Sequence, residues 1–191
     1  MKVVGLNGSA RKDGNTAILL QTVFSELNRQ GIETELIQLA GQPIKGCTAC
    51  GVCLTQKDKR CCITDDFFNE CFAKLIAADG MILGSPVYAA GVTSQIKAVI
   101  DRASMVLAGN RGLLKYKVGA AVTAVRRGGA TSAFDTLTHF LHSKEMFLVG
   151  STYWNMVYGR EIGEVEQDQE GMANMKNLGQ NMAWLLQKIH G

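Results

Sequence analysis

The first sixteen residues, MKVVGLNGSARKDGNT, constrain the fold of this chain more than any other stretch. An apolar run at 3–6 is typical of a buried strand, a turn rich in Gly, Ser and Asn follows it, and apolar residues at helical spacing begin at Ala17. A strand that ends in a small-residue loop before a helix offers an anion unpaired backbone N–H groups and the positive end of the helix dipole. Side-chain donors and a positive charge come from Ser9, Arg11, Asn15 and Thr16. The stretch predicts an anion site within an α/β fold.

The glycine spacing of this loop narrows the choice of anion. Five residues separate Gly8 from Gly14, and Asn-Thr follows, whereas a Walker A loop has four residues between its glycines and then Lys-Ser or Lys-Thr. The G-x-G-x-x-G fingerprint of dinucleotide-binding loops also differs from the spacing of Gly5, Gly8 and Gly14. A phosphate monoester fits best, and a plain turn without a ligand is the alternative.

Composition and charge exclude several classes of protein. The 191 residues are 47% hydrophobic and 19% charged, which favours a single globular domain over 1–191. A net charge of +3, without a basic run interleaved with aromatics, argues against nucleic-acid binding. The sequence lacks both an apolar run near the ~20 residues of a membrane-spanning helix and the pattern of a signal peptide. We therefore expect a cytoplasmic protein with no membrane partner.

Short apolar segments alternate with amphipathic stretches along the rest of the chain. Strands are expected at 3–6, 32–39, 80–83, 118–125 and 146–149, and helices at about 17–30, 65–76, 92–103, 130–143 and 168–190. An irregular or hairpin-like excursion is expected at 150–166. The alternation predicts a doubly wound α/β fold with five parallel strands and right-handed crossovers. With the strand order 2-1-3-4-5, the loops at 8–16, 84–91 and 125–131 meet in one crevice at the carboxyl ends of the strands.

These loops resemble those of a known family. The segments GSARKDGNT, SPVYAAGVTSQIKAVIDR and RRGGATSAFDTLTHF resemble the flavin-binding loops of the flavodoxin-like NADPH-dependent FMN reductases. The stretch GCTACGVCLTQKDKRCCITDDF resembles the compact cysteine motif of the iron–sulfur flavoprotein branch, and the tail from Gly150 onward is similar to that branch too. The resemblance implies a flavodoxin-like fold with FMN at the switch point between the first and third strands.

The resemblance also implies which residues bind FMN. The phosphate group would lie against Ser9, Arg11, Asn15 and Thr16. The isoalloxazine ring would lie along Pro86, Val87, Tyr88 and Ala89. The pyrimidine end of the ring, where a cation stabilises the anionic reduced flavin, would lie near Arg126, Arg127, Gly128 and Gly129. A core position for Tyr88 and a solvated position for the two arginines are the plainer alternatives.

The cysteines suggest a second redox centre. Five of the six cysteines lie within sixteen residues, and a disulfide framework is not expected in a reducing compartment. Cys47, Cys50 and Cys53 have the spacing of a ferredoxin triple, and seven residues separate Cys53 from Cys61. Four such thiolates can hold a [4Fe–4S] cluster, with Cys62 as an alternative fourth ligand.

Two features of this motif leave other interpretations open. The last gap is longer than in bacterial ferredoxins, and no proline follows it. An empty thiol loop and a four-thiolate zinc site are therefore the alternatives.

The sixth cysteine, Cys71, has helical spacing between Phe68 and Leu75, so we expect it in the core. The basic residues Lys57, Lys59 and Arg60 could steer an acidic carrier, although a solvated loop is the simpler interpretation.

Together these patterns predict an FMN-dependent oxidoreductase. FMN would take a hydride from NAD(P)H, or electrons from an acidic carrier such as ferredoxin, and the cluster would relay single electrons to an acceptor. No side chain stands out as an acid–base catalyst, so none is nominated. The alternatives are a cluster-free NAD(P)H:FMN or quinone reductase and a flavodoxin-like electron carrier. The family resemblance further implies a homodimer or homotetramer.

Overall fold

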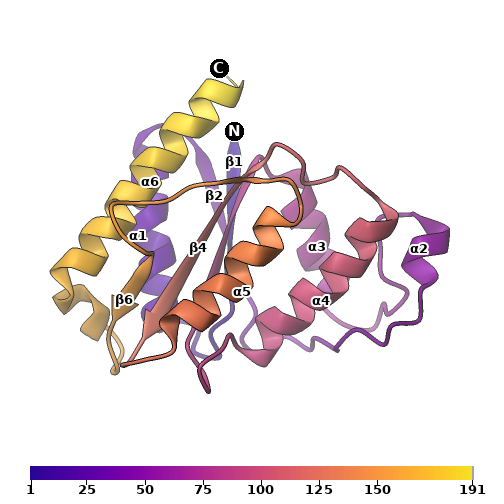
Figure 1. Cartoon of the computed structure of the whole chain (residues 1–191), viewed down its shortest axis with the longest axis horizontal. Coiled ribbons are helices and arrows are strands. Elements are labelled where there is room, and N and C mark those ends of the chain that lie inside the picture. Colours follow the sequence, from indigo (N-terminus) through magenta and orange to yellow (C-terminus); the bar gives the residue numbers. More distant parts are fainter. Residues whose placement is uncertain (191) are drawn as a thin grey trace.

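A computed structural model describes residues 1–190 of the chain. One sheet of parallel strands lies between two layers of helices (Figure 1). The strands are β1 (Lys2–Asn7), β2 (Glu33–Gln38), β3 (Gly80–Pro86), β4 (Val118–Val125), β5 (Phe147–Leu148) and β6 (Met156–Tyr158). The helices are α1 (Asn15–Arg29), α2 (Val52–Gln56), α3 (Phe68–Ala77), α4 (Ser94–Gly109), α5 (Ala130–His142) and α6 (Gln169–His190), with a 3₁₀ turn, η1, at Glu164–Gln167.

The central strands are buried on both faces, which explains why their sequences are continuous apolar runs. Every residue of β4 is buried, and Val4 and Leu6 of β1 are fully covered. One face of the sheet packs against α1 and α6 through a core that includes Leu20 and Met175. The other face packs against α3, α4 and α5 through a core that includes Phe68.

The order of the strands positions the loops around one edge of the sheet. It is β2-β1-β3-β4-β5, and each of these strands runs parallel to its neighbours. The predicted order 2-1-3-4-5 is therefore confirmed. Val3 of β1 lies opposite Thr34 on one side and Gly80 on the other. Because the order reverses at β1 and β3, the loops that leave β1, β3 and β4 converge at their carboxyl ends.

The prediction of an irregular or hairpin-like excursion at 150–166 is wrong for its middle part. Residues Met156–Tyr158 form β6, a sixth strand that runs parallel to β4 with Met156 opposite Thr123. β5 is only two residues long and pairs with the first two residues of β4. The carboxyl half of β4 is consequently free to pair with β6. A three-residue strand is too short to produce a periodic pattern in a sequence.

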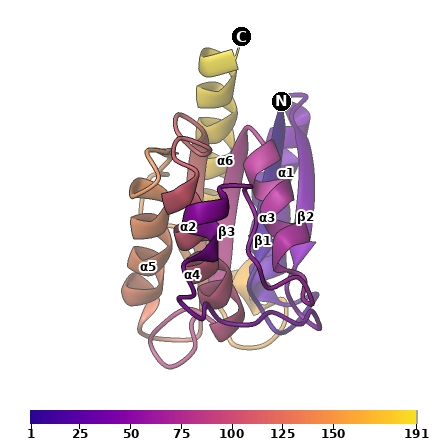
Figure 2. The same ribbon diagram turned by 90° about the vertical axis from the view of Figure 1, so that its right-hand side faces the viewer.

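The helices differ from the predicted ones in three places. Helix α4 ends at Gly109, six residues beyond the end of the helix predicted at 92–103. The cysteine stretch, expected as a loop, contains the five-residue helix α2, which lies on the outside of α4 (Figure 2). α3 begins at Phe68 and not at Asp65, because Asp66 precedes the helix and its carboxylate accepts the Phe68 N–H at 3.2 Å.

None of the helices within residues 1–190 is long and apolar enough to cross a lipid bilayer.

Candidate functional site

A cleft of about 260 Å³ lies at the carboxyl edge of the sheet, among the loops that leave β1, β3, β4 and β6. The predicted residues that line it are Ser9, Arg11, Asn15, Thr16, Pro86, Val87, Tyr88 and Arg126. The remaining predicted residues, Ala89, Arg127, Gly128 and Gly129, belong to the adjoining turns and lie outside this lining. Gly159 and Arg160 also line the cleft. Sequence reasoning missed this pair, although a short apolar run followed by Gly-Arg could have pointed to it.

The start of α1 offers hydrogen-bond donors to the cleft. Gly14 is the N-cap, and no side chain within residues 1–190 caps the helix. The first hydrogen bond of the helix runs from the Ala17 N–H to the Gly14 carbonyl (2.9 Å). The N–H groups of Asn15 and Thr16 precede this bond and therefore have no acceptor within the helix. The buried Thr16 hydroxyl has no hydrogen-bond partner in the described part of the chain. The Ser9 hydroxyl accepts the Arg11 N–H at 3.0 Å and keeps its own proton to donate. These groups fit an anion such as a phosphate.

Asn15 has a different function from the one predicted for its side chain. Its amide nitrogen donates to the carbonyl oxygens of Gly159 (3.3 Å) and Glu161 (2.9 Å). Its amide oxygen accepts the Gly163 N–H at 2.8 Å. The side chain therefore ties the start of α1 to the loop after β6 and brings Gly159 and Arg160 to the cleft. Only the backbone N–H of Asn15 is left to face an anion.

The loop after β3 ends in a tight two-residue turn beside the cleft. The N–H of Tyr88 and the carbonyl of Gly91 are bonded at 2.9 Å, and so are the N–H of Gly91 and the carbonyl of Tyr88. Ala89 and Ala90 between them have φ values of 48° and 58°. This left-handed geometry of two alanines stores roughly 1–2 kcal/mol per residue. Tyr88 is 46% exposed, which removes the alternative of a core residue.

A second cavity lies on the outer side of α4. Five cysteines line it, together with Arg102 and Met105 of α4: Cys47, Cys50, Cys53, Cys61 and Cys62. Cys53 is buried, Cys61 is half-buried, the other three are exposed, and all five are free thiols. Burial, together with the charge of neighbouring Cys61, raises the pKa of Cys53, whereas the Val52 N–H lowers the pKa of Cys50. In residues 1–190, no three His, Cys, Asp or Glu side chains are grouped as ligands of one metal ion.

The sixth cysteine is separate from this cavity. Cys71 lies on α3 in the core between the sheet and α4 and is fully buried. Burial raises the pKa of its thiol to about 12, so the thiol stays protonated at neutral pH. The prediction of a core cysteine is confirmed.

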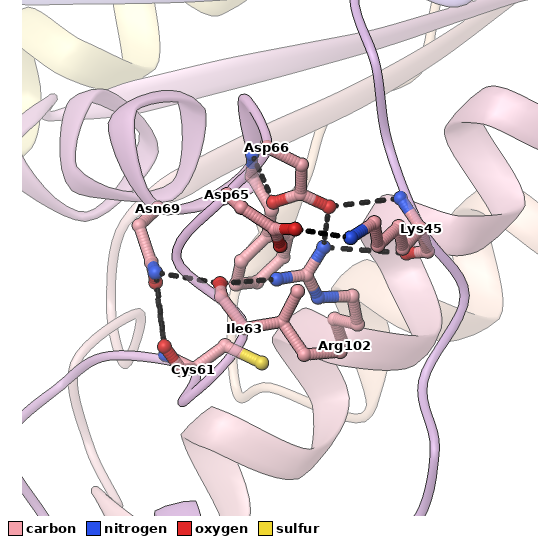
Figure 3. A network of polar contacts seen from close by, with 8 residues as sticks. Lys45, Cys61, Ile63, Asp65, Asp66, Asn69 and Arg102 are labelled. Atoms are coloured by element: carbon pink, nitrogen blue, oxygen red, sulfur yellow. Dashed lines mark hydrogen bonds and ion pairs between the residues drawn. The ribbon is translucent and has the colours of Figure 1, made fainter.

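Both ends of the cysteine stretch are fixed by partly buried polar contacts (Figure 3). The guanidinium of Arg102 donates to the Asp66 carboxylate, to the Lys45 carbonyl at 3.2 Å and to the Ile63 carbonyl at 3.0 Å. The side chain of Asn69 accepts the Cys61 N–H at 2.8 Å and donates to the Cys61 carbonyl at 2.9 Å. These contacts tie the residues that flank the cysteines to α3 and α4. Sequence reasoning missed them because their partners are 8 to 57 positions apart in the chain and form no periodic pattern.

Comparison with known proteins identifies the family of the chain. The family model described as NADPH-dependent FMN reductase matches residues 1–161. The chain belongs to the NADPH-dependent FMN reductase family. A relative from Methanocaldococcus jannaschii, named an iron–sulfur flavoprotein, is 35% identical, and the match covers 99% of this chain and 99% of the relative. The family resemblance of the flavin loops and of the cysteine stretch is thereby confirmed.

Solved structures agree with the fold of this FMN reductase family member. RosB, solved with the bound intermediate 8-demethyl-8-formylriboflavin-5′-phosphate, superposes with a TM-score of 0.78 at 16% identity, over 99% of this chain and 80% of RosB. A WrbA-like flavodoxin from Agrobacterium tumefaciens superposes with a TM-score of 0.64 at 15% identity, over 100% of this chain and 98% of that one. The fold is flavodoxin-like, and the family makes the protein an FMN-binding oxidoreductase.

Proposed function

We propose that this FMN reductase family member transfers electrons from NAD(P)H, or from a reduced carrier protein, to an acceptor, and that its cysteine stretch holds a [4Fe–4S] cluster. FMN supplies two-electron and one-electron chemistry when bound, and the protein supplies binding, orientation and electrostatics. One observation carries the proposal. The buried Thr16 hydroxyl, without a partner within residues 1–190, lies at the uncapped start of α1 and lines a cleft at the switch point of the sheet.

We assign the two ends of the flavin to opposite parts of the cleft. Its phosphate accepts hydrogen bonds from Ser9, Arg11, Thr16 and the N–H groups at the start of α1. Its ring lies along the segment Pro86–Ala89. Arg126, an exposed side chain on the cleft, faces the pyrimidine end and stabilises negative charge there, and Arg127, Gly128 and Gly129 shape the turn that holds it. The riboflavin phosphate bound to RosB supports a ligand of this class.

We expect Gly129→Ala to weaken FMN binding by about tenfold or more. Gly129 has a φ of 85°, and a Cβ there would lie 2.8 Å from the Ala90 Cα. The added methyl group therefore displaces the turn beside the cleft. The measurement is a fluorescence titration of the apoprotein with FMN.

The matched control for that substitution is Gly31→Ala. Gly31 has a φ of 74°, but a Cβ there would have no heavy atom of residues 1–190 within 4 Å apart from its own neighbours in the chain. Both variants carry backbone strain and should melt at a lower temperature than the wild type. Only Gly129→Ala should lose FMN affinity, and equal affinities in the two variants would refute the assignment of this turn to the flavin site.

We assign the cluster to Cys47, Cys50, Cys53 and Cys61. Thiolates are the ligands that iron–sulfur clusters take, and these four line one cavity whose wall includes the apolar side chains of Met105 and Val106. The relative's name supports this assignment. Cys62 lines the same cavity, with its sulfur 3.4 Å from that of Cys50. The relay of single electrons is the chemistry that a bound cluster supplies.

We expect Gly109→Ala to reduce the iron content severalfold and to leave FMN stoichiometric. Replacing a helical glycine by alanine normally stabilises a helix by about 1 kcal/mol. Here, however, a Cβ would overlap the Cys53 carbonyl oxygen and lie 3.0 Å from the Leu54 Cα, so α2 must move away from α4. Iron and flavin are counted after anaerobic purification. Ala108→Ser, at an exposed position on the same helix, is the control, and full iron in Gly109→Ala would show that Cys53 is not a ligand.

The surroundings of the two cavities suggest the partners of the protein. Lys57, Lys59 and Arg60 are exposed within the cysteine stretch and could steer an acidic carrier such as ferredoxin.

Large exposed apolar side chains support association into a homodimer or homotetramer. They belong to β5, to the segment before β6 and to α6: Phe147, Leu148, Tyr153, Trp154 and Trp184. Free thiols at all six cysteines agree with a cytoplasmic location.

Anaerobic stopped-flow reduction tests the electron donor. The protein with bound FMN is mixed with NADPH, with NADH and with a reduced ferredoxin, and the loss of the visible absorbance of oxidised flavin is followed. We expect rapid reduction by at least one nicotinamide. Reduction by ferredoxin alone would make the protein a carrier-fed enzyme or an electron carrier. Reduction by none of the three would contradict the proposed function.

A further inference from the structure

The buried arginine of α4 has an unused donor beside the cysteine cavity. The side chain of Arg102 is fully buried and pairs with the equally buried carboxylate of Asp66. Its two terminal nitrogens donate to Asp66 and to the carbonyls of Lys45 and Ile63, and its carbon Cζ lies 4.1 Å above the ring of Phe68. Its Nε, which is buried as well, finds no hydrogen-bond partner in the described part of the chain.

An unpaired N–H on a buried cation is costly and calls for an explanation. Leaving such a group unsatisfied costs about 1–3 kcal/mol or more. Arg102 and Cys61 both line the cavity formed by the five cysteines, and the Cys61 sulfur lies on the side of Cys61 nearer to Arg102 (Figure 3). Burial lowers the pKa of Arg102, but the Asp66 carboxylate and the neighbouring Cys61 thiol outweigh burial and raise it. The residue that carries the free donor therefore lines the same cavity as Cys61, a cysteine that we assign to the cluster.

We propose that Arg102 is a positioning residue for the iron–sulfur cluster, whose Nε–H donates a hydrogen bond to the Cys61 sulfur. This inference rests on the proposed cluster. Hydrogen bonds to ligand sulfurs and a nearby positive charge both favour the reduced form, because reduction adds negative charge to a cluster already surrounded by thiolates. Asp66 and the Ile63 carbonyl each accept from one terminal nitrogen of the guanidinium, so Nε is the nitrogen left to face the cysteine cavity that Arg102 lines. Arg102 thus raises the reduction potential of the cluster.

Pulsed electron paramagnetic resonance on the wild-type protein tests the contact directly. The protein is labelled with ¹⁵N only at arginine and purified anaerobically, and the cluster is reduced by one electron. Arg102 is the arginine that lines the cysteine cavity. We expect a ¹⁵N coupling to the cluster that disappears in Arg102→Lys. Iron-replete wild-type protein without this coupling overturns the inference and leaves the proposed function standing, whereas protein that binds no iron overturns both.

The reduction potential provides the second readout. Arg102→Lys keeps the positive charge but removes Nε–H, so we expect the midpoint potential of the cluster to become more negative while that of FMN stays unchanged. Arg29→Lys is the matched control, because Arg29 is an exposed residue of α1 on the other side of the sheet. An unchanged cluster potential in Arg102→Lys, or an equal shift in Arg102→Lys and Arg29→Lys, would show that Arg102 has only a structural role.

Discussion

The double substitution of Arg11 by alanine and Thr16 by valine should weaken FMN binding by about 10²- to 10⁴-fold, because each removes a hydrogen bond to a charged phosphate worth roughly 1.5–3 kcal/mol. Arg11 is exposed on the cleft and Thr16 is buried in its wall. Affinities are measured by titrating apoprotein with FMN. Riboflavin serves as the matched ligand, because it has the same ring without the phosphate, and its affinity should not change.

Thr16→Val alone separates ligand binding from stability. The Thr16 hydroxyl has no partner within residues 1–190 of the ligand-free protein, so replacing it by a methyl group of similar size should stabilise the apoprotein by about 1 kcal/mol. The same change should weaken FMN binding. Lys12→Ala, at an exposed residue of the same loop that does not line the cleft, is the control. Unchanged FMN affinity in the double variant, or an equal loss of riboflavin affinity, would contradict the assignment of the phosphate site.

Arg102→Met should lower the free energy of unfolding of the apoprotein by about 3–5 kcal/mol, because it leaves the Asp66 carboxylate buried without its cation. The double variant Arg102→Met with Asp66→Asn should lose less, since no buried charge is then left unpaired. Urea denaturation measures both. The control is Lys97→Met, which breaks an exposed pair between Lys97 and Asp101 on the same helix and should cost less than about 1 kcal/mol. A cost for Arg102→Met as small as that of the control would contradict a stabilising role for the buried pair of Arg102 and Asp66.

The pH dependence of this effect has a definite sign. Burial raises the pKa of Asp66, but hydrogen bonds from Arg102 and from the N–H groups of Lys45 and Phe68 outweigh burial and hold it below its usual value. A carboxyl group with a lowered pKa contributes stability above its unfolded pKa of about 3.9, and this contribution is lost as the pH falls through the folded pKa. The unfolded state is common to the wild type and Arg102→Met, so the difference between their stabilities depends only on the pKa of Asp66 in the two folded proteins. This difference should be largest near neutral pH, shrink as the pH falls, and be lost once the pH has passed through the lowered pKa of Asp66 in the folded wild type.

Features of the fold and of the site that depend on residues close together in the sequence could be predicted, whereas contacts between residues far apart in the chain could not. The central strands and the loop at 8–16 could be predicted, because continuous apolar runs and a donor-rich turn are local patterns. The strand order is not a local pattern, and its prediction depended on the order that is common in flavodoxin-like doubly wound sheets. The hydrogen bond from the Gly163 N–H to the Asn15 side chain joins residues that are 148 positions apart, and the pairing of Arg102 with Asp66 joins residues that are 36 positions apart. No local pattern reveals such contacts. Strand β6 and helix α2 are short, and packing against β4 and α4 stabilises them more than their own sequence does.

The count of FMN, iron and acid-labile sulfide in anaerobically purified protein tests the central claim most directly. A flavoprotein with one [4Fe–4S] cluster should contain one FMN, about four iron atoms and about four sulfides per chain. Replacing Cys47, Cys50, Cys53 or Cys61 by serine should remove the iron and leave the FMN. Stoichiometric FMN without iron would refute the cluster, and protein without FMN would contradict the account as a whole.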